Sequence, residues 1–194
     1  MTAPDKVQAY SFRQQMIMSQ GVVATASVDA VLLGQIPGAA AVVRAAKKDD
    51  RNGTDYWVHV DRSARAISVD AKVLSKDPME FRKPEDTVPL ETWSNKERGN
   101  VGWTRDTSKQ TDYILWIWTP TKRFALVPFR LLCGVFVENW EAWREQYRTH
   151  EQATTRDGRL LYHSECVFVK RRDVWAAIYR KYSGEPKKEE GDES

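Results

Sequence analysis

The stretch GTDYWVHVDRSARAISVDAKV, residues 53–73, contains two short apolar runs with a polar break between them. Acidic residues lie at both outer ends, with Asp55 before the first run and Asp70 after the second. Apolar residues alternate with polar ones, which is typical of strands that have one buried face. The stretch therefore predicts a half-buried β-hairpin, and the register of this hairpin decides which side chains meet.

The apolar residues favour one register. With an even number of residues in the turn, one face of the hairpin is mostly apolar and suited to cover by a helix. Its expected cross-strand pairs are Tyr56–Val69, Val58–Ile67 and Val60–Arg65. A slip of one residue would divide these side chains between the two faces.

The same register places Asp55 directly opposite Asp70 on the other, polar face, which we expect to be the solvated side of the sheet. Lys72 lies on that face one step beyond, because side chains alternate along a strand. Cross-strand β-carbons are about 5 Å apart, which is close enough for two carboxylates to share one cation. Asp61 lies roughly 20 Å from Asp70, at about 3.3 Å per residue, and is expected to be a turn residue.

Two facing carboxylates repel each other unless positive charge lies between them. Lys72 offsets part of that repulsion, and a Mg²⁺ or Mn²⁺ ion bound to the carboxylate oxygens would offset more. Such a metal would polarise a phosphate and activate a water, while the ammonium stabilises developing negative charge or assists deprotonation. Two interpretations stay open at this point: a metal-dependent site for hydrolysing a phosphodiester, or a solvated cluster of salt bridges.

Composition indicates an ordinary globular chain, with 41% hydrophobic and 29% charged residues among 194. We expect one domain over residues 1–183 and a disordered acidic tail over 184–194, where five acidic residues outnumber two lysines. The net charge of +3 thus becomes +6 without the tail, which is compatible with a polyanionic partner. The two cysteines and three histidines lack the spacing of a zinc site, and the cysteines are expected to be buried free thiols. No segment predicts a membrane span or a signal peptide, so we expect a soluble cytoplasmic protein.

The rest of the chain predicts strands with helices at both ends. We expect two short helices within residues 5–33, a turn over 36–38, a loop over 75–87 and strands over 88–94, 111–118, 123–129 and 164–169. We also expect an amphipathic helix over 130–148 and a last helix that is capped by Asp173 and runs to Tyr182. Residues 39–46 fit either a strand or the end of a helix. Residues 111–118 are apolar on both faces, which predicts a central strand. This order indicates an α/β fold with a mixed central β-sheet flanked by helices.

An acidic residue at a strand start, followed by an acid-x-Lys triplet late in the next strand, resembles the motif of the PD-(D/E)XK nuclease superfamily. Here the motif reads Thr54-Asp55, in place of Pro-Asp, and Asp70-Ala71-Lys72. The expected order of elements is also similar to the restriction-endonuclease-like core of that superfamily. The stretches LETWSNKERGNVGW (90–103) and KQTDYILWIW (109–118) resemble small phage-associated members.

The resemblance implies a Mg²⁺- or Mn²⁺-dependent endodeoxyribonuclease. Asp55 and Asp70 would bind the metal, and Lys72 would assist the attacking water. Glu91 is expected either to join the metal ligands, in place of the acidic residue that many members carry on the first helix, or to be a surface charge at a strand end. The resemblance also implies the cytoplasm of a bacterial host as the location, and pairing into a homodimer to cut both DNA strands.

The polar segment over residues 94–109 contains four candidate nucleic-acid contacts. Lys96, Arg98 and Arg105 would bind the phosphate backbone, and Trp103 would stack on a base. A polar loop also carries such charges without this function. Asp112 is expected to start its strand rather than to bind a metal.

Two other functions fit the same residues. A catalytically inactive module of this fold would bind nucleic acid or a protein partner, and the missing acidic residue on the first helix favours it. A protein-interaction factor would fit the eight tryptophans. DNA affinity that falls steeply with salt would exclude this last function, because phosphate contacts release counterions.

Overall fold

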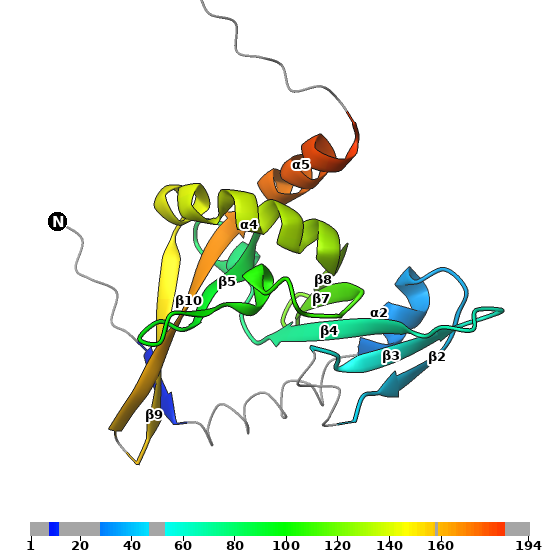
Figure 1. The fold of residues 1–194 in the computed structure, drawn as a ribbon, viewed down its shortest axis with the longest axis horizontal. Coiled ribbons are helices and arrows are strands. Elements are labelled where there is room, and N and C mark those ends of the chain that lie inside the picture. Colours follow the sequence, from blue (N-terminus) through cyan, green and yellow to red (C-terminus); the bar gives the residue numbers. More distant parts are fainter. Residues whose placement is uncertain (1–7, 12–27, 47–52, 158, 185–194) are drawn as a thin grey trace, which may run out of the picture.

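The computed structural model describes residues 8–11, 28–46, 53–157 and 159–184. In this part of the chain the strands form two five-stranded sheets (Figure 1). The sheet with the order β2-β3-β4-β7-β8 is called here the hairpin sheet, and the sheet with the order β1-β9-β10-β5-β6 is called the long-strand sheet. The expected mixed α/β class is confirmed, but the strands are divided between two mixed sheets and do not form one central sheet.

The elements have the following bounds. The strands are β1 (Gln8–Ser11), β2 (Ala39–Arg44), β3 (Tyr56–Val60), β4 (Ile67–Leu74), β5 (Thr87–Asn95), β6 (Asn100–Val101), β7 (Tyr113–Trp118), β8 (Arg123–Pro128), β9 (Thr149–Arg156) and β10 (Arg159–Lys170). The helices are α2 (Val28–Gln35), α4 (Phe129–Gln146) and α5 (Arg171–Tyr182), with short 3₁₀ turns η1 (Pro78–Glu80) and η2 (Trp103–Arg105).

The hairpin of β3 and β4 has the predicted register. Tyr56 pairs with Val69 and Val58 pairs with Ile67, whereas the expected pair of Val60 and Arg65 is not formed, because β4 begins at Ile67. The expected apolar face is covered by α2, whose Leu32 packs into a cluster with these side chains. β2 adds to β3 in antiparallel orientation, and β7 adds to β4 in parallel orientation.

β7 occupies the predicted central position, because both of its faces are buried. Leu115 and Ile117 belong to the cluster under α2. Ile114, Trp116 and Trp118 face the opposite way and join the larger core, which combines α4, α5 and the long-strand sheet. The hairpin sheet therefore lies between α2 on one side and α4 with the second sheet on the other.

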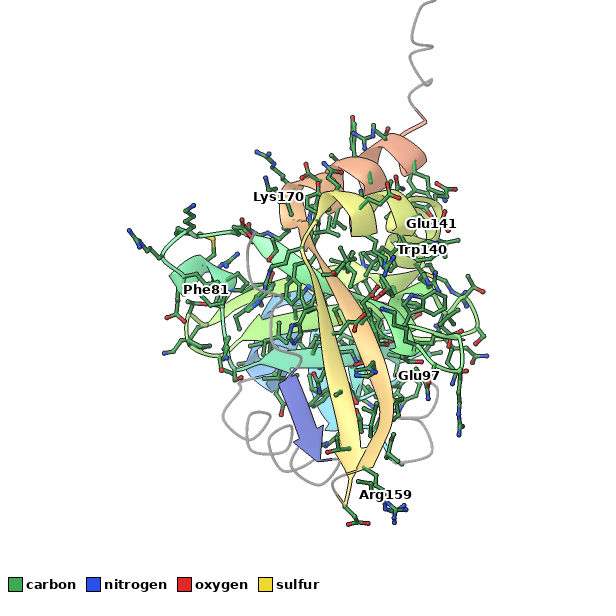
Figure 2. All side chains as sticks on the ribbon, turned by 90° about the vertical axis from the view of Figure 1, so that its left-hand side faces the viewer. Phe81, Glu97, Trp140, Glu141, Arg159 and Lys170 are labelled. Atoms are coloured by element: carbon green, nitrogen blue, oxygen red, sulfur yellow. The ribbon has the colours of Figure 1, made fainter. Side chains whose placement is uncertain are left out.

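The long-strand sheet differs most from the sequence-based expectations. β5, which corresponds to the strand expected over residues 88–94, pairs with β10 and not with a strand of the hairpin sheet. Residues 8–11, expected to be helical, form a strand parallel to β9, while residues 12–27 lie outside the described part of the chain. β9 was not predicted, because its sequence THEQATTR is polar. The β9–β10 pair extends away from α4 and α5, with Arg159 near its far end (Figure 2).

Several smaller predictions can also be compared with the structure. The last helix starts at Arg171, so Asp173 lies in its first turn and is not its cap; its carboxylate accepts a hydrogen bond from the Tyr147 hydroxyl at 2.8 Å. Cys133 and Cys166 are free thiols, as expected, and burial raises the pKa of Cys166 to about 12. No helix among the described residues has the length and apolar character needed to cross a membrane. The expected disorder of the tail concerns residues outside the described part, apart from Gly184.

Candidate metal and phosphate site

Asp55 and Asp70 meet across the two strands of the hairpin, β3 and β4, as the register predicts. Asp55 lies directly before β3, and its Oδ2 accepts a hydrogen bond from the backbone N–H of Ala71 at 2.8 Å. The negative charge of Asp70 also acts on the Asp55 carboxyl. Asp70 is only 2% exposed, so the repulsion between the two carboxyls is weakly screened by water.

The two carboxyls titrate in opposite directions. Burial, together with the adjacent charge of Asp70, raises the pKa of Asp55 to about 6. Burial alone would also raise the pKa of Asp70, but the ammonium groups of Lys72 and Lys109 outweigh it and hold that pKa below its usual value. The pair therefore favours one neutral and one ionised carboxyl in mildly acidic solution.

Two lysines bind the ionised carboxylate, one at each oxygen. The Lys72 ammonium donates to Asp70 Oδ1 at 2.6 Å, and the Lys109 ammonium lies 3.4 Å from Asp70 Oδ2. Burial would lower the pKa of Lys72, but Asp70, Asp55 and Glu91 raise it overall, so this side chain stays protonated. This charge favours stabilisation of negative charge by Lys72 over removal of a proton by it.

The polar face of the hairpin is covered, whereas a solvated face was expected. η2 places Trp103 beside the two ammonium groups, with Lys72 Nζ 5.2 Å and Lys109 Nζ 6.0 Å from the ring centroid. The ring packs in turn against Trp116 of β7, with 6.1 Å between centroids. Trp103 was predicted as a base-stacking residue of an irregular segment, and the structure places it next to the candidate site.

Glu91 supports this covering segment. Its Oε2 accepts a hydrogen bond from the Trp103 backbone N–H at 2.9 Å, and burial raises its pKa. A Cβ at Gly102 would lie 2.2 Å from the backbone oxygen of Glu91, so only glycine permits this approach. Glu91 is close enough to the lysines to interact electrostatically, but its carboxylate is bound to the η2 backbone.

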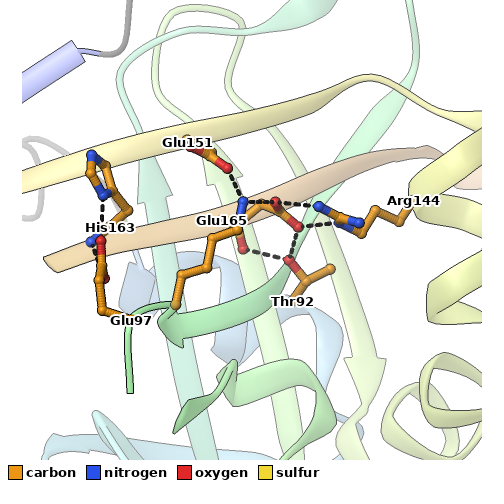
Figure 3. Close-up of polar contacts among 7 residues, drawn as sticks. Thr92, Glu97, Arg144, Glu151, His163 and Glu165 are labelled. Carbon is orange, nitrogen blue, oxygen red and sulfur yellow. Dashed lines mark hydrogen bonds and ion pairs between the residues drawn. The ribbon is translucent and has the colours of Figure 1, made fainter. Parts of the chain in front are cut away.

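The predicted nucleic-acid residues Lys96, Arg98 and Arg105 are not brought to the carboxylate pair. Lys96 forms ion pairs with Glu151 and with Glu165, which is buried on β10 and also binds Arg144 of α4 (Figure 3). The Arg105 guanidinium contacts the rings of both Trp93 and Trp140, at 4.3 and 3.8 Å from their centroids.

Arg98 lies in the exposed turn before β6, where its backbone N–H donates to the Asn95 side chain. Of these three basic residues, Arg98 is thus the one left most open to solvent. Phosphate binding by the three side chains stays a prediction, and a phosphate at Lys96 or Arg105 would have to compete with the contacts already made.

Asp112 has the structural role expected for it. Its Oδ2 accepts hydrogen bonds from the backbone N–H and the hydroxyl of Ser68, and its Oδ1 pairs with Arg65 at 2.6 Å. These contacts join the start of β7 to β4. Asp61 is exposed at the hairpin tip, as a turn residue should be.

Lys109 was not singled out by the sequence. It precedes β7, and its side chain reaches Asp70 across Gly53, a contact between residues 39 apart in the chain. The sequence alone gives no signal for this contact, which follows from the strand pairing. β7 pairs in parallel with β4, so the residues before β7 lie near the beginning of β4.

A metal at this site would have two side-chain ligands. Within the described residues, no group of three or more His, Cys, Asp or Glu side chains is placed to hold a metal ion. The expected three-carboxylate set of Asp55, Asp70 and Glu91 is therefore not assembled here, although Asp55 and Asp70 are adjacent. Metal binding by Asp55 and Asp70 stays a prediction, and so does a relationship to the nuclease superfamily. Compared with family models, with curated proteins and with solved structures, the chain shows no significant similarity to any of them.

Proposed function

We propose that this protein is a divalent-metal-dependent nuclease that hydrolyses DNA phosphodiester bonds at the Asp55–Asp70 pair. One observation carries the proposal: the half-buried carboxyl of Asp55 lies next to the buried carboxyl of Asp70, with a raised pKa at Asp55 and two ammonium groups on Asp70. A protein that only needed a stable sheet would gain by replacing such a pair with apolar residues. Paired carboxyls with pKa values pushed apart are typical of functional sites.

The donor set fits Mg²⁺ or Mn²⁺. Carboxylate oxygens on adjacent strands are hard ligands, and Mg²⁺ is commonly held by one or two carboxylates, with waters and substrate phosphates completing the shell. Asp55 and Asp70 would hold the ion. Glu91 binds the Trp103 backbone, so we assign it to positioning the covering segment and not to the metal.

A bound metal would supply Lewis-acid polarisation of a phosphate oxygen and a lower pKa for a nearby water. Lys72, which stays protonated, would donate hydrogen bonds to the phosphate or to the attacking water as negative charge develops. In the overall reaction the water oxygen bonds to phosphorus, the bond to the leaving oxygen breaks, and the leaving oxygen takes up the proton of the water.

DNA is the proposed substrate because of charge and ring placement. Residues 1–183 carry a net charge of +6, which favours a polyanion. Trp103 places an aromatic ring beside both ammonium groups, where a nucleotide next to the reacting phosphate could contact it.

The test is a cleavage screen with the purified full chain over duplex, branched and single-stranded DNA, in Mg²⁺, in Mn²⁺ and in EDTA. We expect cleavage that requires the metal and that is lost in Asp70→Asn. Asp61→Asn is the matched control, because Asp61 belongs to the same hairpin but is exposed at its tip. Cleavage by Asp70→Asn at the wild-type rate, with its fold intact by circular dichroism, would refute the proposal.

One observation favours a second function, a binding module without cleavage. The described residues assemble two facing carboxylates but no group of three metal-binding side chains. Such a module would bind DNA in a salt-dependent manner but would bind neither Mg²⁺ nor Mn²⁺. Titration calorimetry of both ions into the free protein and into its DNA complex separates the two functions.

A further inference from the structure

We propose that Lys109 is an exchangeable cation of the site: it binds Asp70 in the absence of metal and transfers to a substrate phosphate when a divalent cation binds Asp70. This inference rests on the proposed function and assigns a role to a residue that the motif Asp70-Ala71-Lys72 does not include. Its evidence is the unequal binding of the two oxygens of one carboxylate.

The two Asp70 oxygens differ in how tightly they are held. Lys72 donates to Oδ1 at 2.6 Å, whereas Lys109 Nζ lies 3.4 Å from Oδ2. The longer contact is the weaker one, because it lies outside the usual N–H···O distance range of about 2.7–3.2 Å. Asp55 already uses its Oδ2 to accept from the Ala71 backbone. Oδ2 of Asp70 is therefore the carboxylate oxygen from which a metal would most easily displace an ammonium.

Lys109 has the path that such an exchange needs. Its side chain passes over Gly53, where a Cβ would lie 2.9 Å from Nζ and 3.1 Å from Cδ. The flexible four-carbon stem moves the ammonium without moving the backbone. Nζ also lies 6.0 Å from the centroid of the Trp103 ring, which already has Lys72 Nζ beside it at 5.2 Å. A phosphate placed between these two ammonium groups would have a hydrogen-bond donor on either side.

Charge makes the exchange favourable in both steps. A divalent cation bound at Asp70 adds positive charge beside the ammonium groups of Lys72 and Lys109 and repels both of them. Lys109, with the longer contact, is the one released. A phosphodiester then supplies the negative charge that Lys109 has lost, so metal and substrate each favour the binding of the other.

The first test is Mn²⁺ binding to the free protein, with no DNA present. Lys109→Met removes the competing ammonium, so we expect its Mn²⁺ affinity to rise by about two- to fivefold, the range typical of one partly exposed charge pair. Lys76→Met is the matched control, since Lys76 is an exposed lysine of the loop after β4. Lys109→Gln serves as a second variant of different shape, and thermal unfolding confirms that each variant folds.

The second test measures binding to a duplex with phosphorothioate linkages, which are hydrolysed slowly. In EDTA, wild type and Lys109→Met should bind this duplex equally, because Lys109 is held on Asp70. In Mn²⁺, Lys109→Met should bind about tenfold more weakly than wild type, as expected for loss of a charge-assisted contact to phosphate. Lys109→Arg, which keeps the charge, should recover most of that affinity.

The outcomes separate this inference from the proposed function. Unchanged or weaker Mn²⁺ binding by both Lys109→Met and Lys109→Gln, in a protein whose wild type cleaves DNA, overturns the role of Lys109 alone. A wild type and variants that neither bind Mn²⁺ nor cleave DNA overturn both proposals. Tighter Mn²⁺ binding combined with a DNA defect confined to Mn²⁺ supports the exchange, because a purely structural lysine would weaken both.

Discussion

Asp55→Asn should make the protein more stable at neutral pH while removing a ligand of the proposed metal site. Asparagine resembles the neutral form of this aspartic acid. Its Oδ1 can accept from the Ala71 N–H, as Asp55 Oδ2 does, and its uncharged amide does not repel the Asp70 carboxylate. The substitution thus keeps the contacts and removes the ionisation that burial opposes.

The magnitude follows from the pKa of Asp55, which is raised from 3.8 to about 6. At about 1.4 kcal/mol per pKa unit, the wild-type fold bears a cost of up to about 3 kcal/mol once Asp55 is ionised. Because the folded-state pKa is the higher one, the stabilisation from protonation is complete below pH 3.8 and is lost as the pH rises to about 6. The gain from Asp55→Asn should therefore be small near pH 4, intermediate near pH 5 and constant above pH 7, at about 1–3 kcal/mol.

Urea and thermal unfolding in EDTA measure this gain, which corresponds to roughly 3–10 °C in melting temperature for a chain of this size. Asp61→Asn, at the exposed hairpin tip, should show no such change. Added Mn²⁺ should raise the melting temperature of wild type, because only the folded site binds the ion. It should not raise that of Asp55→Asn, because this variant lacks one of the two proposed ligands. A less stable Asp55→Asn at pH 7.5, or a gain that does not vary between pH 4 and 7.5, would contradict this account of the carboxyl pair.

Three further predictions concern residues outside the carboxylate pair. Gly102→Ala should destabilise the fold by several kcal/mol and reduce any cleavage, because its Cβ would meet the Glu91 backbone at 2.2 Å. Gly34→Ala should instead stabilise α2 by about 0.5–1 kcal/mol, because the space around Gly34 is open. Equal unfolding midpoints for the two glycine variants would contradict this contrast. Glu165→Gln should lower stability at pH 7 by about 1–3 kcal/mol, because it leaves the half-exposed Arg144 without its buried partner. The pKa of Glu165 is lowered to about 2, so this loss should shrink as the pH falls from 4.5 toward 2, as followed by urea unfolding; a loss independent of pH would contradict an ionic role.

The hairpin was predictable because its information is local. Alternation of apolar and polar residues over residues 56–69 fixes both the register and the face, and the observed pairs are those expected. The two-sided apolar character of β7 likewise indicates a strand between two packed layers, which α2 and α4 provide. Both predictions need only the period of a strand and the requirement that apolar side chains be buried.

The second sheet was not predictable in this way. β9 is polar, and its place is fixed by pairing with β10 and β1 and not by an apolar pattern of its own. β5 has a readable strand pattern, but the pattern does not say which sheet the strand joins. Pairings between distant segments depend on the whole core, and no local propensity encodes them.

The site was predictable in its acidic residues and less so in its surroundings. Asp55 and Asp70 meet because the hairpin register brings them together. Lys109 reaches Asp70 from a segment 39 residues away, and it does so because Gly53 has no side chain in its path. The polar face was expected to be solvated; that Trp103 covers it depends on the close approach of Gly102 to Glu91.

The number of hydrogen-bond donors around a carboxylate distinguishes Glu165, which has a structural role, from Asp55, for which we propose a functional one. Glu165 accepts from Thr92, Lys96 and Arg144, and its pKa falls to about 2 despite burial. Asp55, in contrast, receives one backbone N–H and faces a second carboxyl, and its pKa rises to about 6. A fold that supplies enough donors keeps a carboxylate ionised without help, whereas Asp55 needs added positive charge to ionise at no cost. A divalent cation supplies that charge, so the same shortage of donors that lowers stability at neutral pH would raise affinity for a metal.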